Sequence, residues 1–421
     1  MRPFLLALLL LASLPAAVLA QEAPLPFEIE IEEVAWPDPA AIPALHSFAW
    51  AEHDGKWLLV AGRTDGLHGF GADPFPVASA NDAVWVVDPA AGTAWSQPLD
   101  GLSTPLRESL MVTNAQYHQE GETLYLIGGY GHSTEAGTMI TFPTLTAIDV
   151  PELIAAVTGG TDLGPHFRQI EDERMAVTGG ELRKLPLFGQ YLLIGGQRFD
   201  GEYSGPGSEF EQEYLTSIRA FDIDDGAGLA VIGWAEFFTD PDGLHRRDLT
   251  VAPVAWPDAS VGTAHGFGIY GGVFRPAQDL PILEPAFVYH TDVPEYALAD
   301  GFEQQLNHYT CPAVALVDPA TARTFTTFFG GMGLYYEDDD TGEVVADPRV
   351  PFIREVSTLT TEQATPIAET LQPFEMPGFL GTNAAFIPAT DVPQYENGAF
   401  KLDELPAEWV TVGTIYGGLE A

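Results

Sequence analysis

The chain has 421 residues, of which 46% are hydrophobic, so it can form a sizeable core and is not intrinsically disordered. Sixty acidic residues against 17 basic ones give a net charge of -43. This charge disfavours electrostatic binding to nucleic acid or to an anionic membrane surface, and it favours solubility.

The first twenty residues predict a secretory signal peptide. Arg2 is followed by an apolar run from Phe4 to Leu14, and small residues precede Gln21, which places cleavage after Ala20. No later segment is apolar for long enough to span a membrane. We therefore expect a secreted, periplasmic or cell-surface protein with one domain, residues 21–421. The only cysteine is Cys311, so no intramolecular disulfide is expected.

A strand-like apolar run that ends in a glycine occurs six times along the chain. Examples are "WLLVAGR" from Trp57, "LYLIGGY" from Leu124 and "FGIYGGV" from Phe267. The runs end at glycines 62, 129, 196, 272, 331 and 418. Such regular spacing indicates a repeated supersecondary unit. We expect each run to be a buried strand, and the glycines to end it where neighbouring sheets approach closely.

Further strands surround each glycine motif. In the first repeat "HSFAWAEH", "KWLLVAGR", "DAVWVVD" and "TAWSQPL" read as strands a, b, c and d, joined by short polar turns. The third repeat has "TSIRAFDI" and "LAVIGWAEF" as strands c and d. Four antiparallel strands per unit predict the blade of a β-propeller. Residues 150–160 read as the one short helix, ended by a glycine.

The sequence resembles the kelch class of β-propellers. The resemblance is carried by the repeated glycine motifs, followed later in the repeat by an aromatic residue on strand d, such as Trp95 or Trp234. It covers nearly all of the mature chain and implies an all-β, six-bladed propeller. Stretches such as "GRTDGLHGF", "LHRRD", "NHYTC" and "FGGMGLYY" also resemble a family of uncharacterised exported proteins of Bacteroidetes type. Members of that family often carry a C-terminal signal for type IX secretion, and this resemblance implies no activity.

The chain ends immediately after strand b of the sixth repeat, whereas the family pattern continues. Residues 27–36, "FEIEIEEVAW", would supply strand d of the closing blade, and strand c is then missing. Either the reading frame is truncated or the closing blade presents an unpaired edge.

In a propeller, the residues that open strand a and those that follow the glycines lie on one face. This placement predicts a ligand-binding face that contains His46, Arg63, His68, Arg107, His132, Arg174, Arg198, Arg246, Arg275 and Asn307. Arginines in an otherwise acidic protein favour a site for carboxylate, sulfate or phosphate. The alternative is that these arginines pair with neighbouring carboxylates such as Asp65, Asp200 and Asp248 and connect the blades.

Two segments, residues 196–214 and 275–309, are longer than a hairpin needs and carry Tyr203, Phe210, Tyr214, Tyr289 and Tyr296. They suggest a surface that stacks on sugar rings or binds a protein partner. We therefore expect a monomeric, non-catalytic binding module for an anionic glycan or an exported protein. The other possibility outside catalysis is a structural component of the envelope.

A carbohydrate-active enzyme is the main alternative. Kelch propellers include galactose oxidase, but here only Cys311 and its neighbours Tyr309 and His308 fit its copper site. Sialic acid mutarotases of kelch type suggest Glu108, His245 and His308 as acid and base, by analogy of fold and charge alone. The histidines lack zinc-binding spacing, and "YEDDDTGE" lacks the glutamate of a calcium loop, so no metal or other cofactor is expected.

Overall fold

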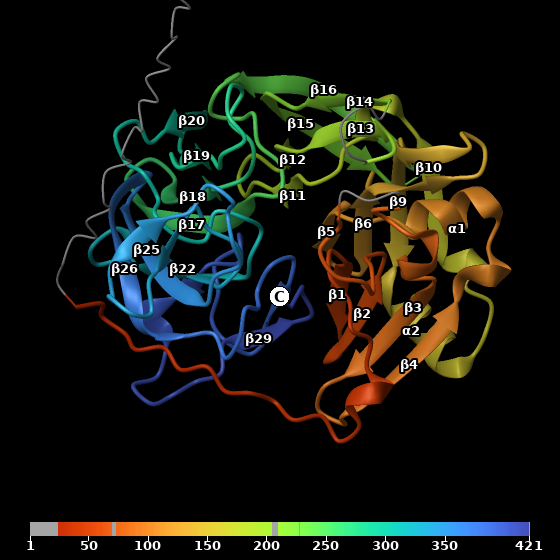
Figure 1. The fold of residues 1–421 in the computed structure, drawn as a ribbon, viewed down its shortest axis with the longest axis horizontal. Helices are drawn as coiled ribbons and strands as arrows, with labels where there is room; N and C mark the ends of the chain where they lie inside the picture. The colour runs from red at the N-terminus through yellow and green to blue at the C-terminus, as the bar shows by residue number, and fades with distance from the viewer. Residues whose placement is uncertain (1–23, 70–72, 204–208, 227, 421) are drawn as a thin grey trace, which may run out of the picture.

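The structure is a computed structural model that describes residues 24–69, 73–203, 209–226 and 228–420. It is an all-β protein in which five sheets, each with four antiparallel strands and one of them with an additional short strand, are arranged as the blades of a β-propeller (Figure 1). The predicted signal peptide lies outside the described residues. Among the described residues, no helix is long and apolar enough to cross a membrane.

The first three blades follow the predicted strand order. Blade 1 contains β1 (Ala49–His53), β2 (Lys56–Val60), β3 (Ala83–Asp88) and β4 (Thr93–Pro98). Blade 2 contains β5 (Gln116–Glu120), β6 (Thr123–Ile127), β9 (Thr144–Asp149) and β10 (Phe167–Glu171). Blade 3 contains β11 (Glu181–Lys184), β12 (Tyr191–Ile194), β15 (Ser217–Asp224) and β16 (Ala230–Thr239).

Blades 4 and 5 have the same order from the centre outwards. Blade 4 contains β17 (Thr250–Asp258), β18 (Gly262–Tyr270), β19 (Ala286–His290) and β20 (Pro294–Leu298). Blade 5 contains β21 (Ala313–Asp318), β22 (Arg323–Phe329), β25 (Glu355–Glu362) and β26 (Thr365–Glu375). A short strand, β28 (Phe400–Lys401), pairs in parallel with the inner strand β21.

The sixth repeat forms a two-stranded sheet of β27 (Ala385–Pro388) and β29 (Gly413–Tyr416). The prediction of six complete blades is therefore not confirmed. Residues 27–36, although described, form no strand, so the predicted closure by an N-terminal strand is wrong. Phe27, Ile29 and Ile31 instead pack by their side chains against an apolar cluster shared by blade 5 and the sixth repeat.

Short hairpins follow the glycines of three repeats. They are β7 (Tyr130–Ser133) with β8 (Thr138–Thr141), β13 (Gln197–Gly201) with β14 (Phe210–Tyr214), and β23 (Tyr335–Glu337) with β24 (Val344–Ala346). The helix α2 (Val150–Gly159) forms where predicted and ends at Gly160 in a left-handed conformation. The helix α1 (Thr104–Leu110), between blades 1 and 2, was not predicted.

The prediction of a long surface segment at 275–309 is wrong for its aromatic residues. Tyr289 lies on β19 and Tyr296 on β20, which are strands c and d of blade 4. Tyr289 packs on Trp256, and the Tyr296 hydroxyl donates a hydrogen bond to Asp240 over 2.9 Å. Both residues therefore stabilise blades and are not available as a loop surface.

The glycine motifs have the predicted role. In each of the six repeats, the final glycine and the residue before it both have positive φ; the residue before it is Ala61 in the first repeat and a glycine in the other five. A Cβ atom on Gly128 would lie within 3.0 Å of the Val177 carbonyl oxygen at the start of the next blade. At Gly128, glycine is therefore favoured by both conformation and space.

Six residues, one from each repeat, form a closed ring of backbone hydrogen bonds around the propeller axis. Each N–H donates to the carbonyl of the residue in the preceding repeat, and the ring closes from Ser47 to Asn383 over 3.0 Å. We call this the axial ring: Ser47, Asn114, Gly179, Asp248, Thr310 and Asn383. The two-stranded sixth repeat thus occupies a position between blade 5 and blade 1.

Candidate functional site

Three of the predicted ligand-binding residues converge beside the axial ring. His46, Arg63 and His68 line a small cavity of about 60 Å³ on the face that carries the glycine loops. Aromatic side chains complete its wall: Phe75, Tyr130, Phe199, Tyr203 and Tyr309. Of the ten residues predicted to share a ligand-binding face, these three meet here: His46 from a strand opening, and Arg63 and His68 from the loop after Gly62.

Arg63 is held by a carboxylate rather than left free. Its Nε and Nη2 donate to the two oxygens of Asp65 over 2.9 and 2.7 Å, and Nη2 also donates to the Pro76 carbonyl over 2.9 Å. The other neighbour of Asp65 is His46, whose Nε2 lies 3.5 Å from Oδ1. Burial lowers the pKa of His46, against the opposing effect of Asp65. The group formed by Arg63, Asp65 and His46 therefore carries little net charge.

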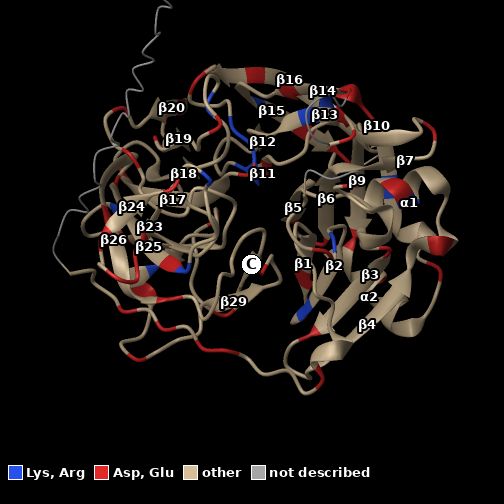
Figure 2. Cartoon of the chain, in the orientation of Figure 1, with Lys and Arg blue, Asp and Glu red and all other residues tan. Residues whose placement is uncertain are grey.

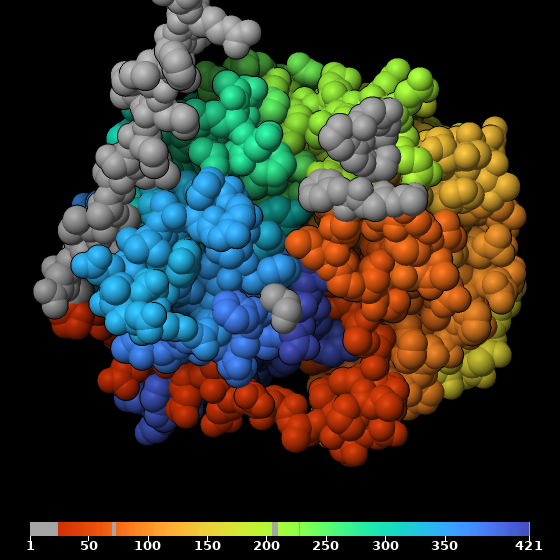
Figure 3. Space-filling view, in the orientation of Figure 1, coloured from red at the N-terminus to blue at the C-terminus, as the bar shows by residue number. Residues whose placement is uncertain are grey.

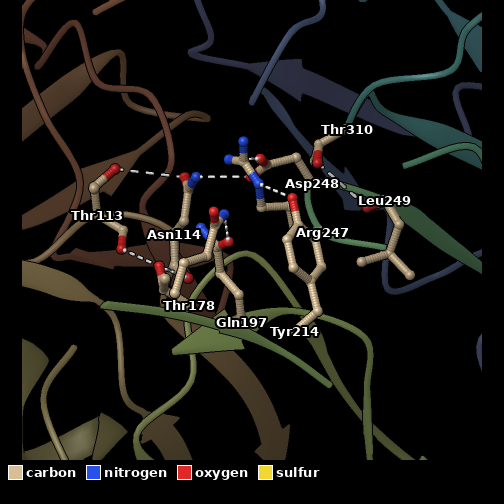
Figure 4. Close-up of polar contacts among 10 residues, drawn as sticks. Thr113, Asn114, Thr178, Gln197, Tyr214, Arg247, Asp248, Leu249 and Thr310 are labelled. Carbon is tan, nitrogen blue, oxygen red and sulfur yellow. Dashed lines mark hydrogen bonds and ion pairs between the residues drawn. The ribbon is translucent and has the colours of Figure 1, made fainter. Parts of the chain in front are cut away.

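A second buried ion pair lies across the cavity, at the axial ring (Figure 4). Arg247 Nη1 donates to Asp248 Oδ2 over 3.0 Å, and Arg247 Nε donates to the Tyr214 hydroxyl over 3.0 Å. Asn114 Nδ2 donates to the other oxygen, Asp248 Oδ1, also over 3.0 Å. The two residues of the ion pair are only 9% and 3% exposed. The pair therefore joins blades 2, 3 and 4.

These contacts account for the two arginines, Arg63 and Arg247, that line the small cavity. Both of them form ion pairs with carboxylates of their own repeat, so the local positive field predicted from the sequence is largely neutralised. The cavity beside them has room for only a few water molecules. We conclude that this cavity is not large enough for a sugar.

A much larger cavity, of about 630 Å³, lies along the axis on the other side of the axial ring. The axial ring separates the two cavities, because five of its residues line both of them. The exposed residues of the large cavity are Gly121, Thr390, Glu396 and Gly398. Gly121 is the turn between strands a and b of blade 2. The large cavity therefore reaches the surface at the end of the propeller opposite the glycine loops.

The inner strands of blades 1, 2 and 3 give this axial cavity a polar and aromatic wall. Trp50 and Tyr117 line it, and Arg183 Nη2 forms an ion pair with Glu181 over 2.9 Å. Gln119 Nε2 donates to the Glu52 carbonyl over 2.8 Å, and Gln119 Oε1 accepts from the Glu52 N–H over 2.8 Å. Blades 4 and 5 contribute mainly small residues: Ala252, Pro253, Ala313 and Ala315. Because these residues are small, the cavity extends between blades 4 and 5 and the polar wall formed by blades 1, 2 and 3.

The charge of the axial cavity is predominantly negative. Its lining includes the carboxylates of Glu52, Glu181, Asp248 and Glu396, but only one arginine, Arg183. Burial raises the pKa of Glu181, an effect that Arg183 opposes. Acidic residues also dominate the outer surface, where Figure 2 shows them around the rim of the molecule. An anionic ligand would be repelled at this end of the axis.

An insertion in the sixth repeat partly covers this end of the axis. Between β27 and β28 the chain crosses to blade 4, where Asn397 Nδ2 donates to the carbonyls of Val254 and Gly266 over 2.9 and 3.0 Å. The ring of Tyr395 lies 5.9 Å from that of His265. At the other end, the C-terminal residues (dark blue in Figure 3) lie at the centre of the face shown.

Neither a family model nor a curated protein sequence matches this chain.

Three of the remaining predicted ligand-binding residues are held within the protein. Arg246 is 0% exposed, and its guanidinium donates to the carbonyls of Gly243, Gly271 and Glu284 over 2.6, 2.9 and 3.1 Å. Asn307 Nδ2 donates to the Gly330 and Glu355 carbonyls. Arg275 Nε donates to the Pro281 carbonyl. These side chains support loops and line neither cavity.

The other four lie away from the two cavities. Arg174 pairs with Asp172 and packs on Trp234 of the outer strand β16, and Arg198 pairs with Asp200 and Glu173. Arg107 lies on α1, and His132 lies on β7. They are dispersed over blades 2 and 3 and form no common site.

The three candidate acid and base residues have separate partners. Glu108, on α1, accepts hydrogen bonds from the backbone and hydroxyl of Thr134. His245 stacks on Tyr214 at 4.0 Å between ring centroids. His308 is fully buried, with Nε2 at 2.8 Å from the Gln304 carbonyl and Nδ1 accepting from the Leu334 N–H. The geometry therefore does not assemble them around one substrate position.

The polar wall of the axial cavity was missed by sequence reasoning. Trp50, Tyr117, Glu181 and Arg183 lie within strand a of their repeats, not at its opening. A usable signal was present, because strand a borders the axis of a propeller and its large polar residues must face it.

Proposed function

We propose that the protein is a binding module that takes a neutral carbohydrate into the axial cavity without catalysing a reaction. The observation that carries this proposal is the wall in which Trp50 and Tyr117 lie beside the Glu181–Arg183 ion pair. Aromatic faces pack against the C–H groups of a sugar, and carboxylate, guanidinium and amide groups bind its hydroxyls.

The size and charge of the cavity support the same ligand class. A volume of about 630 Å³ lies within the usual range for small-molecule sites, roughly 300–1,000 Å³. The excess of carboxylates favours a neutral ligand over an acidic one. This differs from the anionic ligand expected from the arginines, because the arginines at the axis already have carboxylate partners.

A sixth blade is part of the proposal, since the cavity needs a closed wall. Gly418 N–H donates to the Leu45 carbonyl over 2.9 Å, as the corresponding glycines do between consecutive blades. Apolar side chains of the sixth repeat also pack on both neighbours, through Ile387 on the blade 1 side and Ile415 on the blade 5 side. We therefore regard β27 and β29 as strands a and b of an incomplete sixth blade. Export through the signal peptide, with cleavage after Ala20, is likewise proposed from the sequence alone.

The test is a comparison of neutral, amino and acidic saccharides by thermal shift and isothermal calorimetry, because a ligand of the native state raises the melting temperature. We expect a neutral saccharide to bind, and Trp50→Ala and Glu181→Gln each to weaken binding at least tenfold. Trp409→Ala and Glu408→Gln, at exposed positions, are the matched controls.

Circular dichroism of each variant separates loss of binding from loss of fold. Tighter binding of an acidic saccharide than of any neutral one would refute the proposal. So would binding that survives both substitutions in the cavity wall.

A further inference from the structure

The inner pair of strands in the sixth repeat is less well covered than its counterparts. In blades 1, 2, 3 and 5, strand b is buried along nearly its whole length, and a strand c pairs with its outer edge. In the sixth repeat only Tyr416 of β29 is buried, and Gly413, Thr414 and Ile415 are partly exposed. Among the described residues, β29 pairs with β27 alone.

The register of β27 and β29 shows which backbone N–H and carbonyl groups of β29 make no hydrogen bond to β27. The Ala389 N–H donates to the Val412 carbonyl over 2.9 Å. Because hydrogen-bonded pairs alternate in an antiparallel ladder, Val412, Thr414 and Tyr416 direct their backbone groups to β27. Gly413 and Ile415 therefore direct theirs outwards. Within the described part of the chain, no hydrogen bond outside the ladder reaches the N–H or carbonyl of Ile415.

The N-terminal segment does not supply the missing strand. Residues 27–36 run along the rim of the molecule, outside β29 in Figure 1, and form no ladder. Phe27, Ile29 and Ile31 are partly buried, while the intervening Glu28 and Glu30 are exposed. The segment thus presents an apolar side towards the core and an acidic side to solvent.

The neighbourhood of the free edge combines exposed apolar and acidic groups. Trp409 is 62% exposed, and Val410, which leads into β29, is 37% exposed. Asp403, Glu404 and Glu408 are exposed on the chain that leads to the strand. A second copy of this chain would bring its own acidic residues to the edge, which is unfavourable at a net charge of -43.

We propose that β29 is a docking edge for an extended segment of a partner protein, which pairs with it antiparallel in the place that strand c takes in the five complete blades. Backbone hydrogen bonds to Ile415 provide the pairing. Alternate apolar side chains of the segment pack beside Ile415, and the intervening basic side chains face the acidic surroundings. The occupant is therefore a strand with alternating apolar and basic residues. This site is separate from the axial cavity.

The experiment uses the purified protein and three eight-residue peptides of isoleucine and lysine or glutamate. One alternates isoleucine with lysine, one has the same composition in two blocks, and one alternates isoleucine with glutamate. We expect the alternating lysine peptide to bind at least tenfold more tightly than the other two. Hydrogen exchange should slow in residues 413–416 on binding, because the Ile415 amide becomes a ladder donor.

Ile415→Pro removes the outward N–H and leaves the hydrogen bonds to β27 in place. We expect this variant to lose at least tenfold in affinity, while Ile415→Val binds as the wild type does. Equal binding of the alternating and block lysine peptides would overturn the proposal, because it would indicate charge attraction alone. Unchanged binding of the peptide to Ile415→Pro would overturn it too. So would a dimer of the protein that persists in sedimentation experiments when the peptide is added, because the occupant of the edge would then be a second copy of this chain.

Discussion

Asn114 Nδ2 donates a hydrogen bond to Asp248 Oδ1 over 3.0 Å, although the two residues come from the second and fourth repeats. The residue between them in the axial ring is Gly179, which has no side chain to separate them. A Cβ atom on Gly179 would lie 3.0 Å from Asp248 Oδ1. The direct bond therefore depends on a glycine in the third repeat.

Because Asp248 is the counterion of the buried Arg247, its removal should be strongly destabilising. We expect Asp248→Ala to lower the free energy of unfolding by about 3–5 kcal/mol, since Arg247 would remain buried without a carboxylate. Urea denaturation measures the change. Asp347→Ala is the control, because Asp347 pairs with an Arg349 that is 87% exposed, and it should cost at most about 1 kcal/mol. Equal effects of the two substitutions would contradict the structural role of the Arg247–Asp248 pair.

The glycine motifs predict a position-dependent cost of alanine. Gly128 has a φ of 62° and Gly121 a φ of 58°, so alanine is strained at both. Only at Gly128 would the new Cβ meet the backbone of the next blade, whereas at Gly121 nothing lies within 4 Å. We expect Gly121→Ala to cost about 1 kcal/mol and Gly128→Ala to shift the thermal midpoint several times as far. Similar midpoints for the two variants would show that conformation, not crowding between blades, explains these glycines.

The strands could be predicted because their signals are local. The apolar run before Gly129 and the turn between strands a and b are properties of a few consecutive residues, and both form as expected. The state of the sixth repeat could not be predicted in the same way. Whether residues 27–36 join a ladder depends on the distance of that segment from β29, which no local pattern encodes.

The site was harder to predict because the role of an arginine depends on its partners. Arg63, after a glycine motif, and Arg246, before a strand a, were both predicted to lie on the ligand-binding face, yet one lines a cavity beside Asp65 and the other is enclosed by carbonyls. Asp65 is only two residues from Arg63 in the sequence, so an ion pair between them could be predicted as the alternative to a free arginine. The polar wall of the axial cavity combines strands from three repeats, and only the closed propeller brings them together.

Arg246 should act as a support of the loops and not as a ligand-binding residue. Its replacement by methionine keeps the apolar volume but leaves the Gly243, Gly271 and Glu284 carbonyls without their donor. We expect a loss of stability on the order of 3–5 kcal/mol, with saccharide affinity unchanged in the fraction that remains folded. The control is Arg323→Met, which removes an exposed pair with Glu362. A folded Arg246→Met protein that no longer binds the ligand would assign Arg246 to the site instead.

His308 should make stability depend on pH in a defined direction. Burial lowers its pKa from 6.5 to about 4, and protonation would also break the bond that Nδ1 accepts from the Leu334 N–H. The unfolded chain then binds more protons than the folded one between pH 4 and 6.5, so this residue makes stability rise with pH across that window. Its full contribution is about 3 kcal/mol.

We expect the rise in unfolding free energy from pH 4.5 to 7 to be smaller in His308→Gln than in the wild type. His53→Gln, at a partly exposed turn beside Asp54, should leave it unchanged. Because the other histidines are common to both proteins, the difference between the two profiles isolates His308. Parallel profiles would mean that His308 has the same pKa in the folded and the unfolded chain, contrary to its burial and its hydrogen bonds with Gln304 and Leu334.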